Sequence, residues 1–84
     1  MKKNFNREVI QLSNSSGSSI KMLFDPWAFV LNMPEGSDYE LHIDCPVGEK
    51  SHALILRKGG WVIAPLNGEF LEIRKGDQVV FDFR

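Results

Sequence analysis

The sequence predicts an all-β fold, arranged as a small antiparallel β-sandwich or barrel of roughly six to eight short strands. Three observations predict it. First, apolar side chains do not recur at helical spacing in any segment of about 11 or more residues that lacks Gly and Pro. Short runs of β-branched, aromatic and aliphatic residues recur at roughly ten-residue spacing. Turn-forming residues, mainly Gly, Asn, Asp and Pro, separate these runs.

Each expected strand has side chains that suit a sheet. The first two are apolar runs on either side of a Ser-rich stretch, and the third follows an Asp-Pro bend. The fourth and eighth alternate in polarity, the fifth and sixth are continuously apolar, and the seventh precedes a Gly-Asp turn. In chain order the strands are Glu8 to Leu12, Ser19 to Phe24, Trp27 to Met33, Tyr39 to Asp44, His52 to Arg57, Trp61 to Pro65, Phe70 to Arg74 and Gln78 to Phe83.

The turn sequences predict how the later strands connect, because Gly and Asn tolerate the positive φ of tight hairpins and Pro presets a bend. Four hairpins are expected, which would make the second half of the chain an antiparallel meander. Their turns are Pro46-Val47-Gly48-Glu49, Lys58-Gly59-Gly60, Leu66-Asn67-Gly68 and Lys75-Gly76-Asp77. The polar stretch Ser13 to Ser19 is expected to be a flexible loop inside a single domain that spans residues 1–84.

Alternation predicts which strand faces are buried, since residues two apart on a strand share a face. From Tyr39 to Asp44, apolar and polar side chains alternate, so that strand has one wet face. The runs Ala53 to Leu56 and Trp61 to Ala64 are apolar throughout, as expected for strands that are covered on both sides. Either the sheet closes around these two strands or another subunit covers them. A sandwich or barrel in the jelly-roll or cupin-like style satisfies both patterns.

Two segments resemble known proteins. The stretch Asp25-Pro26-Trp27, followed by a short strand and Pro34-Glu35-Gly36, resembles a motif of small uncharacterised bacterial β-proteins. That resemblance implies a fold and no activity. The stretch from Gly68 to Phe81, with its Gly76-Asp77 turn, is similar to the closing hairpin of cupin-type jelly rolls. The His-x-His and downstream Glu of metal-dependent cupins have no counterpart here, so this likeness implies cupin-like architecture without cupin metal chemistry.

Composition limits the classes of function. With 10 Lys and Arg against 11 Asp and Glu, the net charge of −1 gives no general attraction for nucleic acid or an anionic membrane. A chain of 84 residues buries only about 60% of its unfolded surface, which disfavours a large catalytic cleft. Cys45 is the only cysteine, so no internal disulfide can form. We expect a soluble cytoplasmic protein, because no run has signal-peptide or membrane-span length.

The richest set of reactive side chains is His42, Asp44, Cys45 and His52. His42 and His52 would face each other if the turn between their strands centred near Val47. However, no Cys-x-x-Cys or His-x-His pair is present, and Cys45 has the opposite strand parity to His42 and Asp44. Nucleophilic catalysis by Cys45 would also need an oriented base and an oxyanion-binding turn. We therefore expect no metal, no cofactor and no catalytic residue, with solvated histidines and a small, partly buried cysteine.

Charge is unevenly placed along the chain. Between residues 22 and 49 there are acidic residues and no Lys or Arg, whereas basic pairs stand at the later turns, Arg57-Lys58 and Arg74-Lys75. Trp61 lies near the first pair. We expect Trp27 to be a core anchor at the Asp25-Pro26 bend, since a Trp in a small β-domain usually packs inside. The expected ligand or partner contacts are Trp61, Arg57, Lys58, Glu40, His42 and Asp44.

These observations favour a non-catalytic binding module. The acidic side would be a docking face for a basic protein partner, as expected of an adaptor, inhibitor or immunity protein. The expected partner is another protein or a second copy of the chain as a homodimer, with nucleic acid and membranes disfavoured. A small-ligand-binding cupin-like domain is the alternative, and a small metal- or Cys-dependent enzyme is less favoured. A ligand binder should have a partly empty apolar cavity, whereas an interaction module should have a filled interior and an exposed patch.

Overall fold

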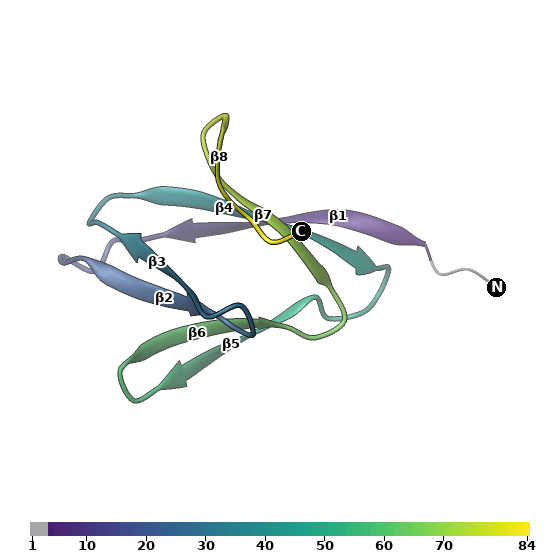
Figure 1. The fold of residues 1–84 in the computed structure, drawn as a ribbon, viewed down its shortest axis with the longest axis horizontal. Coiled ribbons are helices and arrows are strands. Elements are labelled where there is room, and N and C mark those ends of the chain that lie inside the picture. The colour runs from purple at the N-terminus through teal and green to yellow at the C-terminus, as the bar shows by residue number, and fades with distance from the viewer. Residues whose placement is uncertain (1–3) are drawn as a thin grey trace.

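The computed structural model describes residues 4–84, and within this range the chain is built from β-strands joined by turns (Figure 1). No helix in this range is long and apolar enough to cross a membrane. Every one of the expected strands is present, with ends that differ by at most a few residues. The strands are β1 (Phe5–Ser13), β2 (Ile20–Phe24), β3 (Phe29–Met33), β4 (Asp38–Pro46), β5 (His52–Arg57), β6 (Gly60–Pro65), β7 (Glu69–Lys75) and β8 (Gln78–Asp82).

The strands form two four-stranded sheets that pack as a small β-sandwich, which confirms the predicted fold class. Sheet A has the order β1-β4-β7-β8 and is antiparallel throughout. Sheet B has the order β3-β2-β6-β5, in which β2 and β6 run parallel and the other pairs run antiparallel. The parallel pair brings a strand from the first third of the chain against the β5–β6 hairpin.

The expected meander is wrong, because two of its four turns connect different sheets. The turns at Lys58–Gly60 and Lys75–Asp77 do close hairpins, β5–β6 and β7–β8. The turn after Pro46 instead leads from sheet A to sheet B, and the one around Asn67 leads back. This second crossing is tight, since a Cβ on Gly68 would lie 2.6 Å from Cγ2 of Ile43. Turn residues therefore predicted where the chain bends, but not which strand it then pairs with.

The core lies between the sheets and is rich in aromatic rings. Phe24 from sheet B and Phe70 from sheet A are fully buried, and their ring centroids are 6.4 Å apart. Phe81 stacks on Phe29 at 3.9 Å, and Phe83 lies 5.5 Å from Phe24. The last residues of the chain therefore close the sandwich by returning their rings to the core.

Asn14 organises the Ser-rich loop between β1 and β2. Its buried amide Nδ2 donates hydrogen bonds to the carbonyls of Ser18 and Met33, and its Oδ1 accepts from the backbone and hydroxyl of Ser16. The amide of Gly17 donates to the Glu35 carboxylate at 2.7 Å. The loop is thus hydrogen-bonded at several points, and the flexibility expected of residues 13–19 stays a prediction that hydrogen exchange can test.

Candidate functional site

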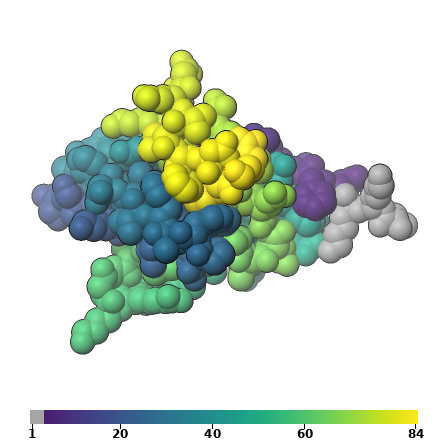
Figure 2. All heavy atoms as spheres, in the orientation of Figure 1, coloured from purple at the N-terminus to yellow at the C-terminus, as the bar shows by residue number. Residues whose placement is uncertain are grey.

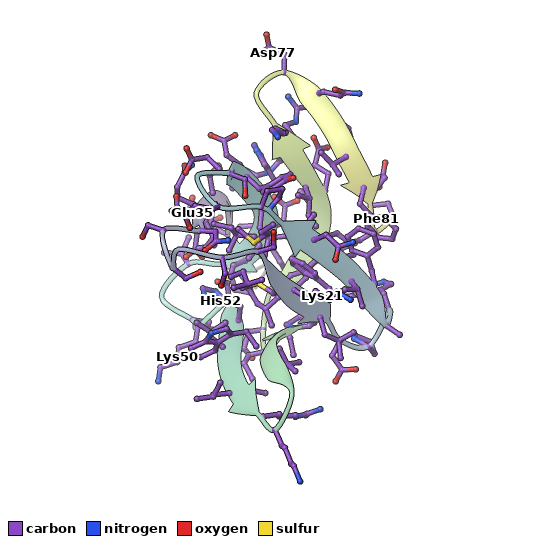
Figure 3. All side chains as sticks on the ribbon, turned by 90° about the vertical axis from the view of Figure 1, so that its left-hand side faces the viewer. Lys21, Glu35, Lys50, His52, Asp77 and Phe81 are labelled. Atoms are coloured by element: carbon purple, nitrogen blue, oxygen red, sulfur yellow. The ribbon has the colours of Figure 1, made fainter. Side chains whose placement is uncertain are left out.

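The β5–β6 hairpin projects from the body of the sandwich, at the opposite end from the β7–β8 hairpin. Figure 2 shows it protruding at the lower left, and Figure 3 shows it pointing down while the tip of β7–β8 at Asp77 points up. Within sheet B, β5 is an edge strand that pairs only with β6. Of the two strands expected to be covered on both sides, β6 buries the adjacent residues Val62 and Ile63 on opposite faces, whereas β5 leaves Leu54 and Leu56 exposed. Of the two alternatives, closure of the sheet around them is wrong.

Large apolar side chains are exposed on this hairpin. Leu54 pairs with the buried Ile63, and Leu56 pairs with Trp61, so both leucines stand on the core-facing side of sheet B. Because the hairpin extends past sheet A, Leu54 is 54% exposed and Leu56 67% exposed, and Trp61 is 38% exposed. The opposite face is apolar too, with Ile55 and Val62. We call Leu54, Leu56 and Trp61 the hairpin surface.

The free edge of β5 lacks the features that usually protect an edge strand, such as a bulge, a proline or a charge within the strand. Between His52 and Arg57 the sequence is Ala-Leu-Ile-Leu, and its register with β6 is regular. Both β5 and edge strand β8 end at a charged residue, Arg57 and Asp82, but only β8 is bulged, against β7 between Ile73 and Arg74. An unprotected apolar edge is the kind of strand to which another chain can add.

A groove of about 290 Å³ lies beside the hairpin. Its apolar part comes from Leu23, Val30 and Val62, which neighbour one another across β3, β2 and β6. Its other lining residues belong to the start of β2 and to the tip of the β5–β6 hairpin. We call it the cationic groove, and it is lined by Lys21, Leu23, Val30, Arg57, Lys58, Gly59, Gly60, Trp61 and Val62.

The groove lining contains three cations, Lys21, Arg57 and Lys58, and no carboxylate. All three side chains are exposed, and within residues 4–84 none of them forms an ion pair. The arginines of sheet A are different, since each of them is paired. Arg7 Nε lies 3.1 Å from Asp44 Oδ1, and Arg74 and Arg84 both bind Glu72. Unpaired positive charge is therefore concentrated where the surface is also apolar.

The structure divides the six expected contact residues between two sheets. Arg57, Lys58 and Trp61 lie together along the cationic groove. Glu40, His42 and Asp44 lie on β4 in sheet A, where each already has a partner. Asp44 is paired with Arg7, and His42 Nε2 lies 3.2 Å from Glu40 Oε1. The carboxylates of β4 are thus paired with Arg7 and His42, which weakens their case as an acidic docking face, although Nδ1 of His42 is buried without a hydrogen-bond partner among the described residues.

Glu72 is the centre of the polar cluster on sheet A. Although it is a carboxylate, it is only 5% exposed, because Arg74 and the C-terminal Arg84 cover it. The hydrogen bond from Arg74 lowers the pKa of Glu72 below its usual value; the charges of Arg74, Arg84 and His42 lower it further, whereas burial acts to raise it. The pKa of Asp82 is also lowered, mainly by its hydrogen bonds from Arg84. This cluster ties the end of the chain to sheet A.

The set of reactive side chains expected near residues 42–52 is not assembled. His42 and His52 belong to different sheets and do not face each other. The His42 side chain is only 14% exposed, so the expectation that His42 is solvated is wrong. Cys45 is buried, and its thiol donates to the Glu49 carbonyl at 3.4 Å. Burial, together with the negative charges of Glu8 and Glu49, raises the pKa of Cys45 and keeps it a weak nucleophile. Within residues 4–84, no three His, Cys, Asp or Glu side chains form a group that could hold a metal ion.

Trp27 is only partly the core anchor that the sequence predicts. It lies in the turn between β2 and β3, whose Asp25–Pro26 peptide bond is cis, and not in the strand that was expected to begin there. Its ring stacks on Phe70 at 5.4 Å and contacts Phe83 at 4.6 Å. One side of the indole remains open, so Trp27 is 37% exposed. It covers the aromatic core from outside.

Sequence reasoning missed Lys21, Leu23, Val30 and Val62 as groove residues. Their presence there depends on the parallel pairing of β2 with β6, which aligns Leu23 with Val62 across 39 positions of sequence. No pattern within either strand alone predicts such a pairing. The exposed leucines did leave a signal, namely the uninterrupted apolar run from Ala53 to Leu56. That run predicts a strand covered on both faces, whereas β5 is an edge strand that half-buries Ala53 and Ile55 and exposes Leu54 and Leu56.

Comparisons with protein-family models, curated proteins and solved structures found no match for this chain. The resemblance of the Asp25-Pro26-Trp27 segment to small bacterial β-proteins stays a prediction, as does the likeness of the last hairpin to cupins. Any conclusion about function therefore depends on the chain's own residues.

Proposed function

We propose that this chain is a non-catalytic protein-interaction module that binds its partner through the β5–β6 hairpin. The main observation behind this proposal is that Leu54 and Leu56 are exposed on the core-facing side of sheet B, on the unprotected edge strand β5. An apolar surface of this kind is costly in water unless a partner covers it. A partner strand that added to β5 would gain backbone hydrogen bonds and cover both leucines.

The interior supports binding at the surface over binding inside. Aromatic rings from both sheets meet across the core, with Phe24, Phe70 and Phe83 in mutual contact. A small-ligand-binding cupin-like domain remains the second candidate, and the cationic groove is the place where such a ligand would bind. The setting we propose is the cytoplasm of a bacterium, since the unpaired thiol of Cys45 suits a reducing compartment.

Site-specific photo-cross-linking tests the proposal. A benzophenone amino acid would replace Leu56 in one variant and Val80 in a matched control, because both positions are exposed on hairpins at opposite ends of the molecule. After irradiation in native cells, mass spectrometry would identify the adducts. We expect a defined protein adduct at position 56, either with another protein or with a second copy of the chain, and none of that mass at position 80. Equal adducts at both positions, or none at 56, would contradict the proposal.

A further inference from the structure

The cationic groove and the hairpin surface lie on opposite faces of sheet B, since Leu23 and Val62 alternate along their strands with core-facing residues. The two meet at the hairpin tip, where Trp61 borders both. A partner that covers Leu54 and Leu56 would therefore reach the groove by passing around the tip at Lys58–Gly60. The chemistry of the groove is specific in two respects: its floor is apolar, and its rim carries Lys21, Arg57 and Lys58 without a carboxylate. A ligand complementary to both features has apolar groups next to negative charges.

Building on the proposed function, we infer that the partner's docking segment is an extended acidic peptide, with apolar side chains on Leu23, Val30 and Val62 and carboxylates at Lys21, Arg57 and Lys58. The groove is open at the surface, so a small ligand bound there would stay largely in water, whereas small-molecule sites usually enclose most of their ligand. A protein segment is long enough to follow the groove and then to pass around the hairpin tip onto the hairpin surface.

Charge also distinguishes this partner from a second copy of the chain. If two β5 strands paired antiparallel about Ile55, Arg57 and Lys58 of one chain would lie beside Ala53 and His52 of the other, with Lys50 close by. In that register the two cations would gain no carboxylate beside them. An acidic segment instead brings opposite charges to the groove.

The groove is also a poor match for a nucleic acid. The second basic pair expected from the sequence does not extend the groove. Arg74 binds Glu72, and Lys75 lies over the Tyr39 ring at 5.3 Å, both on sheet A. A single-stranded nucleic acid needs a basic track with stacking platforms along its length. Three cations around an apolar floor are better suited to a short acidic segment.

The test is an NMR titration of the full chain with synthetic five-residue peptides. The probe is acetyl-Glu-Phe-Glu-Leu-Glu-amide, compared with a matched peptide in which Gln replaces each Glu and with a dodecamer of thymidylate. We expect the Glu peptide to shift the amide signals of Gly59, Gly60 and Val62 and the indole signal of Trp61. The Gln peptide should bind about tenfold more weakly, the loss expected when several exposed ion pairs are removed together.

Charge-reversal variants provide the control. Arg57→Glu combined with Lys58→Glu should reduce affinity for the Glu peptide by about tenfold or more, whereas Lys50→Glu, a cation outside the groove, should change it less than twofold. Equal binding of both peptides, no shifts at the groove, tighter binding of the thymidylate dodecamer, or self-association that alone shifts these signals would each overturn the inference. Adducts at position 56 without peptide binding would leave the interaction module standing and reject only its acidic partner.

Discussion

The two projecting hairpins of this molecule look alike in sequence but have opposite surroundings in the fold. Both close on glycine turns, and both extend from the ends of the sandwich (Figure 3). The chain that continues from β8 returns to the core through Phe81 and Phe83, and Asp82 and Arg84 join the ion pairs around Glu72. The β5–β6 hairpin returns no large side chain from β5 to the core, and its cations are unpaired. The β7–β8 hairpin therefore contributes to the core and its ion pairs, whereas the β5–β6 hairpin leaves its apolar side chains and cations at the surface.

The largest effect is expected from Phe83→Ala. The ring of Phe83 contacts Phe24, Trp27, Phe29 and Phe70, so its loss opens a cavity at the closed end of the sandwich. The free energy of unfolding should fall by about 3 kcal/mol, measured by urea denaturation followed by circular dichroism. The matched change Leu56→Ala should alter it by less than about 0.5 kcal/mol. Similar losses for the two variants would remove the contrast between the hairpins.

The sequence predicted the strands of this fold because alternation and turn chemistry are local properties. Each expected strand exists, and the wet and dry faces of β4 lie as predicted. Pairing across the chain was not predictable in the same way. The crossings at Pro46 and Gly68 and the parallel β2–β6 pair depend on how the two sheets pack. For the same reason Arg57, Lys58 and Trp61 could be selected from the sequence as candidate contacts, while Lys21, which lines the same groove, could not.

Trp27→Ala should have the next largest effect. The indole covers Phe70 and Phe83 but keeps one side in water, so its removal should cost about 2 kcal/mol, less than for a fully buried Trp. Urea denaturation measures this loss. A midpoint equal to that of the wild type would show that Trp27 does not support the core, and it would then become a candidate for partner contact.

Asn14→Ala should have a smaller effect, concentrated in one loop. The variant loses the hydrogen bonds to Ser16, Ser18 and Met33, which should cost about 1–2 kcal/mol. Hydrogen exchange should show faster exchange at the amides of Ser16 and Gly17, with little change in β5 and β6. If these two amides already exchange in the wild type as fast as an unfolded chain, the loop is flexible despite its hydrogen bonds.

The smallest effect is a pH dependence that comes from the cluster around Glu72. A carboxyl whose pKa is lowered in the folded chain stabilises the fold above its unfolded pKa, near 4.5, and this stabilisation is lost as pH falls through the lower folded pKa. Glu72→Gln should therefore be less stable than the wild type at pH 7, and its stability should decrease less on acidification. Parallel pH profiles of unfolding for the two proteins would contradict a role for Glu72.

The most direct test of the contrast between the hairpins is the stability of the double variant Leu54→Glu and Leu56→Glu. Charges at these positions would be strongly destabilising if the leucines packed in the core, and nearly neutral if the leucines face water and await a partner. We predict that urea denaturation gives a free energy of unfolding within about 1 kcal/mol of the wild type. A variant that is unfolded, or destabilised by more than about 3 kcal/mol, would show that the β5–β6 hairpin belongs to the core.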